Sequence, residues 1–271
     1  LLTDVLEKTR VYGIETNLDY VASVLATATA QTGQLLTKTL SDHTPSYSTI
    51  RVLAAGTQTT IQDFPGRQGY WNVGVPPSGP MDSYSLRVAN KLLETPETAA
   101  GLEMTACGPS LRFEADATIA LTGADMQAEL DGVKVRRYAK IFVSAGQTLT
   151  MGKVVGAGAR AYLAVTGGID CPLYLGSRAT FTLGQFGGHV GRALRAGDVL
   201  HLGAPIKLKT TVKPRTFDIP KIPQIMELRV IYGPHGAPDF FTNEDITEFF
   251  ASEWKVHFNS SRTGVRLIGP K

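Results

Sequence analysis

Cysteine is scarce in this sequence, and its scarcity excludes two kinds of small-protein framework. Cys107 and Cys171 are the only cysteines among 271 residues, so neither a set of disulfides nor a C-x-x-C metal or redox pair is present. Basic residues number 27 against 24 acidic ones, and no block of lysine and arginine stands out, which argues against a nucleic-acid partner. No apolar run approaches the roughly 18–20 residues that span a bilayer, so a membrane protein is not expected either.

Several catalytic signatures are also missing. The sequence contains no G-x-x-x-x-G-K-[ST] phosphate loop, no H-E-x-x-H zinc motif and no G-x-S-x-G nucleophile turn. Residues 156–161 satisfy a loose G-x-G-x-x-A pattern, but they lead into an expected strand where a dinucleotide site needs a helix. The histidines are scattered without the spacing of metal ligands, so no metal site is expected. They are His43, His189, His201, His235 and His257.

Glycine and proline are plentiful, and they predict a mainly β fold with a few helices and many tight turns. The 28 glycines and 15 prolines separate short runs that are typical of strands. Asp131-Gly132, between two such runs, is a dipeptide favoured by a type I′ hairpin turn. One amphipathic helix is expected at 82–94, with Asp82 at its start. Strands are expected at 50–53, 59–62, 117–122, 126–130, 133–137, 140–144, 147–151, 160–166 and 198–202.

The pattern changes along the chain and divides it into five expected parts. Leu18, Val21 and Leu25 form one apolar stripe and predict a helix over 18–31, followed by an extended segment. Closing many short strands on themselves removes exposed edges, so a β-barrel is the favoured fold for the central part. The expected parts are a short helical appendage at 1–40, a linker at 41–49, a β-barrel lobe at 50–203, a Pro/Lys-rich connection at 204–224 and the start of a second lobe at 225–271.

The second lobe is expected to be incomplete. It begins at 228–232 (LRVIY) and contains a short helix opened by Thr242, with Asp245 three residues on as in an imperfect capping box. About 45 residues are too few for an independent core. The chain also opens without an initiator methionine or a signal-type segment, so we expect a truncated piece of a longer polypeptide.

The densest polar constellation lies at 62–82. It combines Arg67, Asn72, Ser78 and Asp82 with rigid Gly/Pro turns, and fixed loops with charged and aromatic groups are how sites are built on β scaffolds. A purely structural role is equally open for each residue. Asp63 and Arg67 would then pair to pin the loop, and Asp82 would only cap the helix.

A second constellation lies at 176–192. Its many glycines allow close backbone approach, and its arginines, Arg178 and Arg192, are each able to grip a carboxylate, with His189 between them. The alternative is a glycine-rich array of turns with two solvated arginines. These two stretches alone combine Arg, Ser, Asn and Asp with free backbone N–H groups, so we expect them to converge on one concave face together with the start of the 82–94 helix.

Several of these segments resemble a known family in order along the chain. Over about 50–271 the sequence is similar to the allophanate hydrolase subunit 2 family, also called KipA-like, whose fold consists of cyclophilin-like β-barrel lobes. The motifs that carry the resemblance are 61–67 (IQDFPGR), 74–82 (GVPPSGPMD), 101–103 (GLE), 107–109 (CGP), 121–124 (LTGA), 161–170 (AYLAVTGGID) and 175–178 (LGSR).

The preceding residues narrow this resemblance to one branch of the family. Residues 10–20 (RVYGIETNLDY) resemble the C-terminal end of a biotin carboxylase domain, so 1–40 would be the tail of such a domain. A biotin carboxylase tail that runs into a KipA-like domain is the order of urea carboxylases, including fungal-type urea amidolyases. The resemblance therefore implies a fragment of the carboxyltransferase region of a biotin-dependent, cytoplasmic urea carboxylase.

This resemblance also implies a reaction and its participants. The carboxyl group of carboxybiotin is transferred to urea to give allophanate, with biotin on a separate carrier domain and with ATP and Mg used by the body of the biotin carboxylase. The implied partners are those two domains and the KipI-like half of the carboxyltransferase in the same polypeptide. None of these parts is in this chain, so the fragment alone is expected to be inactive.

Within that reaction the candidate residues receive expected roles. Asp82 would orient or deprotonate urea, and no residue is assigned to the cofactor itself or to a metal. The substrate-binding candidates are Arg67, Asn72, Ser78, Arg178, His189 and Arg192. Two alternatives remain open: a KipA-like component of an ATP-dependent 5-oxoprolinase, and a non-catalytic regulatory or binding module. The biotin carboxylase tail argues against the first of these.

Overall fold

The computed structural model divides the chain into two compact units, residues 1–224 and 225–271. The residues it describes are 2–9, 11, 14, 16–34, 37–41, 43, 48–204, 217, 219, 221–262 and 264–270. Most of the expected linker at 41–49 and of the connection at 204–224 therefore lies outside the described residues. None of the helices within the described part is long and apolar enough to cross a membrane.

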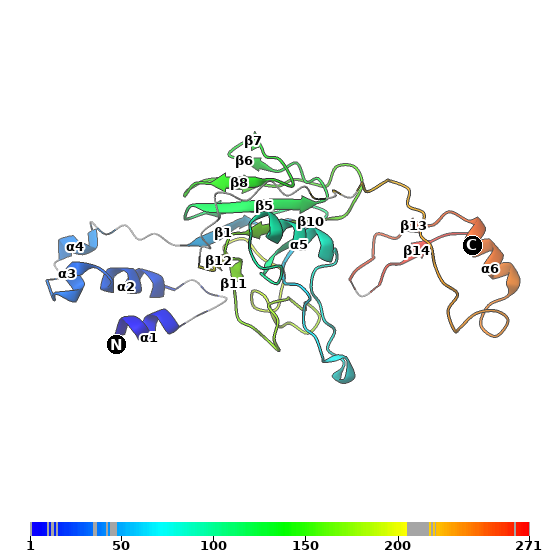
Figure 1. Ribbon diagram of the computed structural model, residues 1–271, viewed down its shortest axis with the longest axis horizontal. Helices are drawn as coiled ribbons and strands as arrows, with labels where there is room; N and C mark the ends of the chain where they lie inside the picture. The colour runs from blue at the N-terminus through cyan, green and yellow to red at the C-terminus, as the bar shows by residue number, and fades with distance from the viewer. Residues whose placement is uncertain are drawn as a thin grey trace. The chain divides into compact units, whose positions relative to one another are not determined.

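The N-terminal segment holds four short helices (Figure 1). They are α1 (Leu2–Lys8), α2 (Leu18–Leu25), α3 (Ala28–Gln31) and α4 (Thr37–Ser41). The continuous helix expected at 18–31 is wrong, because Thr27 breaks it: its side chain accepts a hydrogen bond from the Ala30 N–H at 3.3 Å and starts a new helix. The extended segment expected afterwards contains α4 instead.

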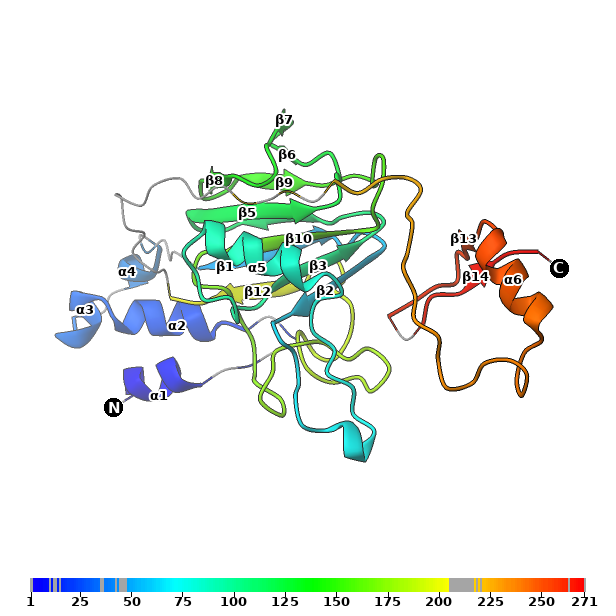
Figure 2. The same ribbon diagram turned by 45° about the vertical axis from the view of Figure 1, so that its right-hand side comes forward.

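Two antiparallel sheets form the centre of the first unit (Figures 1 and 2). One sheet has seven strands in the order β11-β12-β1-β4-β9-β6-β7, and the other has five in the order β2-β3-β10-β5-β8. Within the described residues neither sheet closes on itself, so the fold is mainly β as expected but is made of two open sheets. The strands are β1 (Thr49–Ala54), β2 (Gln58–Gln62), β3 (Gly101–Thr105), β4 (Ser110–Phe113), β5 (Ala117–Gly123), β6 (Glu129–Leu130), β7 (Val133–Lys134), β8 (Lys140–Val143), β9 (Thr148–Thr150), β10 (Arg160–Val165), β11 (Ile169–Asp170) and β12 (Val199–Leu202).

A single apolar core joins the two sheets. Its members alternate along the strands with residues on the opposite face, as the period of two requires. From the seven-stranded sheet it takes Ile50, Val52, Leu111, Phe113, Leu149 and Leu200, and from the five-stranded sheet Ile61, Leu102, Met104, Ile119, Leu121, Leu163 and Val165. The burial of these side chains away from water is the main stabilising contribution to the unit.

Helix α5 (Ser83–Leu92) covers the other face of the five-stranded sheet, where it packs on β5 and β10 (Figure 2). Its end packs through Ala89 and Leu93 against Ala120 and Ala164, which are a register pair on those two strands. Because these side chains are small, the helix approaches the sheet closely. The helix expected at 82–94 is therefore confirmed.

The turns and termini of the strands agree in part with expectation. The Asp131-Gly132 hairpin is confirmed, with φ of 48° and 80° at its two residues, although the strands β6 and β7 that it joins have only two residues each. β3, β4 and β11 were not expected.

The second unit contains α6 (Asn243–Ala251), β13 (Lys255–Val256) and β14 (Leu267–Ile268). Thr242 and Asp245 form the expected capping box at the start of α6. The run 228–232, where the second lobe was expected to begin, pairs with no other strand among the described residues. No described residue in 225–271 is buried.

Candidate functional site

The two polar loops predicted to converge lie side by side at one end of the first unit, below the sheets in both views (Figures 1 and 2). Asp63, at the end of β2, connects them: its carboxylate accepts hydrogen bonds from the Ser177 hydroxyl at 2.6 Å and from the Arg178 N–H at 2.7 Å. The Thr180 N–H also donates to the Ile61 carbonyl at 2.9 Å. The loop after β2 and the glycine-rich stretch are therefore one structural element.

Arg67 holds the two loops of this element together. Its side chain is 1% exposed, and it donates to the carbonyl oxygens of Tyr174 and Ala179 at 3.0 and 2.9 Å. The guanidinium carbon lies 4.8 Å from the centre of the Phe186 ring, a cation–π contact. Burial lowers the pKa of Arg67 from its ordinary value, and the nearby Asp63 carboxylate opposes that shift. Two of the three guanidinium nitrogens bind backbone carbonyls and the side chain is buried, so the contacts of Arg67 in this structure favour the structural role over the predicted binding role.

Arg178 lies at the edge of the same element. Its Nε donates to the Cys171 carbonyl at 2.8 Å, and one terminal nitrogen lies 3.4 Å from an Asp170 carboxylate oxygen. One third of its side chain is exposed. Arg178 is therefore held by a neighbour of the loop but still faces solvent, and it remains a candidate for contact with an anionic group.

Arg192 and His189 form a separate cluster with Asp198, in which His189 is buried and Arg192 is half-buried. Arg192 donates to both carboxylate oxygens of Asp198 at 2.8 and 2.9 Å, a bidentate pair. His189 is 5% exposed, and its Nε2 lies 3.4 Å from Asp198. Burial lowers the pKa of His189 below 6.5, so the neutral ring is favoured at pH 7. These two predicted binding residues thus anchor the end of the glycine-rich stretch.

Asp82 occupies the N-cap of α5. One carboxylate oxygen accepts from the Ser85 N–H at 3.0 Å, and the other accepts from the Ser85 hydroxyl. The capping role that was weighed against catalysis is therefore real. A carboxylate that caps a helix can still accept a hydrogen bond from a ligand, because each of its oxygens has a further lone pair.

Asn72 and Ser78 are the predicted residues whose polar groups are free. Asn72 is exposed on η1 (Trp71–Val73), a single turn at the tip of the loop (Figure 2), and Ser78 is half-buried with a φ of 56°. In the part of the chain that the structure describes, neither side chain makes a hydrogen bond. These are the side chains that are open to a ligand without any rearrangement.

Glu103 and Tyr162 are close to Asp82 and were not singled out from the sequence. The Tyr162 hydroxyl accepts from the Asp82 N–H at 2.7 Å, and a Glu103 oxygen accepts from the Met81 N–H at the same distance. A signal was present: Glu103 is a charged residue inside the strand run Gly101–Thr105, where burial is expected on at least one face.

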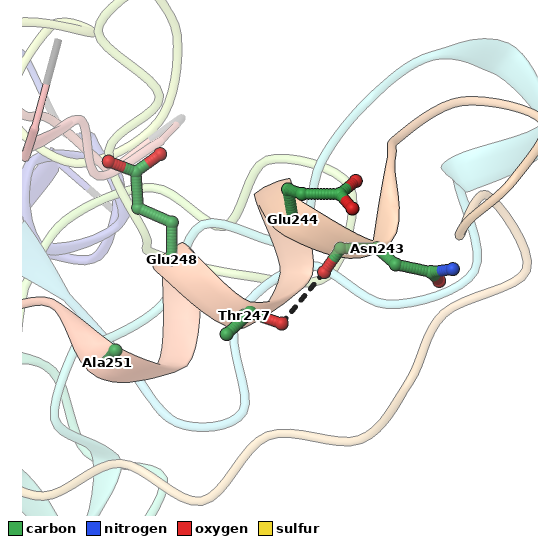
Figure 3. A pocket seen from close by; sticks show the side chains of 5 residues that line it. All are labelled: Asn243, Glu244, Thr247, Glu248 and Ala251. Carbon is green, nitrogen blue, oxygen red and sulfur yellow. Dashed lines mark hydrogen bonds between the residues drawn. The ribbon is translucent and has the colours of Figure 1, made fainter.

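Two other features of the described residues carry no site. A shallow hollow on α6 is lined by Asn243, Glu244, Thr247, Glu248 and Ala251, all of them exposed, and its one internal hydrogen bond is the ordinary helical contact of the Thr247 hydroxyl with the Asn243 carbonyl (Figure 3).

Within the same described residues no three His, Cys, Asp or Glu side chains are grouped to hold a metal ion. Cys107 and Cys171 are both free thiols.

The chain belongs to the family described as "Carboxyltransferase domain, subdomain A and B", whose model matches residues 73–271. The family resemblance drawn from the sequence motifs is thereby confirmed.

Relatives place the chain more narrowly. It is 45% identical over 276 residues to urea amidolyase of Saccharomyces cerevisiae, an alignment that covers 100% of this chain and 15% of that protein. The solved structure of Kluyveromyces lactis urea carboxylase matches 99% of this chain and 25% of its own at 42% identity, with a TM-score of 0.87. A 5-oxoprolinase subunit of Escherichia coli is 34% identical, over 81% of this chain and 68% of that protein. The chain therefore spans only a small part of its urea-related relatives.

Proposed function

We propose that this chain is part of the carboxyltransferase region of a biotin-dependent urea carboxylase, in which a carboxyl group passes from biotin to a nitrogen of urea. One observation carries the proposal: the alignment with urea amidolyase covers 100% of the chain, whereas that with the Escherichia coli 5-oxoprolinase protein covers 81%. The latter alignment has 223 residues, about as many as residues 50–271 contain. The N-terminal helices are thus shared with the urea enzymes.

The division of the chain follows from the same proposal. Residues 1–40 would be the end of a biotin carboxylase domain, 50–203 the first carboxyltransferase lobe and 225–271 the start of a second lobe. The remaining partners would be the KipI-like half, the body of the biotin carboxylase with its ATP and Mg, and the biotin carrier, all in one polypeptide. The small share of the urea amidolyase length that this chain covers leaves room for them.

The free polar groups fit the chemistry of biotin and urea. Both molecules present a carbonyl oxygen flanked by N–H groups, and an amide or hydroxyl side chain matches such an edge as both donor and acceptor. Asn72 and Ser78 supply these groups without breaking any internal contact, and Trp71, which precedes Asn72 in the sequence, is exposed as well. When it is presented here, biotin supplies the carboxyl group, and the loop residues orient the two ureido edges toward each other.

Asp82 then accepts a hydrogen bond from a urea N–H group. Its carboxylate is fixed by Ser85 on one side, so its remaining lone pairs have a defined direction. A fixed carboxylate stabilises the positive charge that develops on the urea nitrogen as this nitrogen bonds to the carboxyl carbon, and it takes up the proton that the nitrogen loses. Arg178, one third exposed, is the remaining guanidinium able to attract the transferring carboxylate. Arg67 and His189 keep the loops in place from the interior, and the bidentate pair with Asp198 occupies Arg192.

The test uses the full-length enzyme with Asp82→Asn. Asparagine is also a good N-cap, so the helix start is retained while the negative charge is lost. Carboxyl transfer to urea should slow by ~10²–10³-fold, while ATP cleavage that depends on biotin continues. Asp116→Asn is the matched control, because Asp116 accepts a backbone N–H from Ala145 at 2.8 Å on an exposed loop of the same unit. Normal transfer by Asp82→Asn would remove Asp82 from the site.

The 5-oxoprolinase alternative is separated by substrate. The same full-length enzyme is supplied with urea or with 5-oxoproline, and consumption of each is followed with and without avidin, which sequesters biotin. Turnover of urea that avidin blocks supports the proposal. Turnover of 5-oxoproline alone would show instead that the similarity to the 5-oxoprolinase protein reflects a shared activity.

A further inference from the structure

A row of buried polar side chains crosses the five-stranded sheet on the face under α5. Tyr162 of β10 is in register with Glu103 of β3 on one side and with Thr122 of β5 on the other. The row continues to Thr60 of β2, the register partner of Glu103. All four residues are buried, Glu103 at 3% and Tyr162 at 0% exposure. Opposite strand pairs place such side chains within contact distance of each other on one face.

This row holds the turn before α5 by its backbone. The Asp82 N–H donates to the Tyr162 hydroxyl at 2.7 Å, that hydroxyl donates to a Glu103 oxygen at 2.9 Å, and the same oxygen accepts from the Met81 N–H at 2.7 Å. Two consecutive peptide groups and two side chains therefore close a ring of hydrogen bonds. Arg160 lies 3.6 Å from the other Glu103 oxygen and balances its charge.

Thr122, another member of the row, fixes the first turn of α5. The Thr122 hydroxyl donates to the Ser85 carbonyl at 2.8 Å, and Ser85 is the residue that binds both carboxylate oxygens of Asp82. Asp82 is thus held from its own N–H through Tyr162 and from its side chain through Ser85. The backbone and the carboxylate of Asp82 are therefore both held in place by side chains of β3, β5 and β10.

Packing alone does not require this row. One register step away on the same face, Ala120 and Ala164 hold the end of α5 with apolar contacts only. A buried carboxylate carries a desolvation penalty of several kcal/mol, and an unpaired buried hydroxyl about 1–3 kcal/mol, so the row costs free energy that its directional bonds must offset. Here the bonds end on the residue that the proposed function places against urea.

We propose that Tyr162, Glu103 and Thr122 are positioning residues, which fix the place and direction of the Asp82 carboxylate at the start of α5. The inference rests on the proposed function of Asp82. None of the three touches the substrate: they act through the turn, and removal of one allows the carboxylate to shift by a fraction of an ångström. Misplacement on the order of 1 Å costs about 10²-fold in rate, so a smaller shift should cost about tenfold.

The experiment compares Tyr162→Phe with Tyr138→Phe in the full-length enzyme. Tyr138 is the matched control, because its hydroxyl also accepts a backbone N–H, that of Gly123 at 3.0 Å, but it makes no bond to the turn. The measured quantities are kcat and KM for urea, ATP cleavage that depends on biotin, and the unfolding temperature. We expect Tyr162→Phe to lower kcat for urea about tenfold with KM little changed, because orientation matters most in the transition state. ATP cleavage should persist, and Tyr138→Phe should transfer normally.

The outcomes separate the inference from the proposed function. Normal kcat in Tyr162→Phe, or an equal loss of kcat and unfolding temperature in both variants, overturns the positioning role. If Tyr162→Phe does not fold, Thr122→Val is measured against Thr166→Val. Thr166 is the matched control because its hydroxyl donates to the Thr118 carbonyl at 3.1 Å and makes no bond to the turn. A slow Asp82→Asn with a normal Tyr162→Phe rejects only the inference. A normal Asp82→Asn rejects the proposed role of Asp82 itself.

Discussion

A single arginine illustrates how far a residue type predicts its role. In the sequence, Arg67 stands among glycines and prolines, where an exposed cation is the ordinary expectation. In the structure it is buried between the Phe186 ring and two carbonyl oxygens. Those carbonyls belong to a segment more than 100 residues away, so no local pattern could have indicated them. The guanidinium hydrogen-bonds to these carbonyls, and Asp63 acts on it through its nearby charge.

His189 makes the stability of the chain depend on pH. Burial lowers its pKa below the 6.5 of the unfolded chain, and the positive charge of Arg192 adds to that effect, although Asp198 opposes it. The unfolded state therefore binds the proton first, and the stability that the neutral ring contributes is complete above pH 6.5 and is lost as the pH falls below it. The slope cannot exceed about 1.4 kcal/mol per pH unit for one proton.

The direction of this pH dependence can be measured with the variant His189→Gln. The free energy of unfolding in guanidinium chloride is determined at about pH 7 and about pH 5 for both proteins. The decrease toward the lower pH should be smaller in the variant by up to about 2 kcal/mol, which is the limit for one proton between about pH 6.5 and about pH 5. Equal decreases in the two proteins would show that the buried ring does not couple to pH.

At the scale of elements, the glycine-rich stretch depends on close backbone contact. A Cβ on Gly187 would lie 2.1 Å from the Ala179 carbonyl oxygen and 2.8 Å from a nitrogen of Arg67, whereas a Cβ on Gly176 would meet nothing within 4 Å. Both glycines have positive φ, 73° and 78°, so alanine is strained at each by a similar amount.

Gly187→Ala and Gly176→Ala therefore isolate the contact. We expect Gly187→Ala to lower the free energy of unfolding by about 2 kcal/mol more than Gly176→Ala, because only the former forces the two loops apart. Chemical denaturation of both variants gives the difference. Equal losses would mean that the backbone conformation, and not the approach of Arg67 and Ala179, is what glycine serves here.

Elements with a complete local signal were predicted from the sequence, and those defined by pairing were not. The run Arg160–Val165 and the cap at Asp82 each carry their own signal, and both are observed. The run 228–232 is as rich in β-branched and aromatic residues, but it finds no partner among the described residues and forms no strand. For the same reason the convergence of the loops was predictable in outline, whereas the hydrogen-bond partners of each side chain were not.

At the scale of the whole chain, the two units differ in what holds them. The first has a core shared by two sheets, and the second has no buried described residue. Phe258 of the second unit is 92% exposed in a turn, and Phe142 of the first is 75% exposed on the paired strand β8. Two phenylalanines of similar exposure are thus set in very different surroundings.

Limited proteolysis of this 271-residue chain with chymotrypsin should reveal the difference. Cleavage requires local unfolding of several residues, and that opening is easiest where few buried contacts are lost. We expect cleavage after Phe258 before any cleavage after Phe142, as followed by mass spectrometry over time. Simultaneous cleavage at both sites would show that the paired strand gives no more protection than the turn does.

The polar row under α5 also links the register of the strands to the geometry of the candidate site. Side chains alternate between the two faces of a strand, so a slip of β10 by one residue would turn Tyr162 toward the apolar core and bring an alanine or a leucine under the turn. A chain that folded with that error would bury a phenol and a carboxylate without partners and would leave Met81 and Asp82 unheld. The bonds that aim the Asp82 carboxylate therefore also penalise the misaligned sheet, and folding fidelity and site geometry are enforced by the same three side chains.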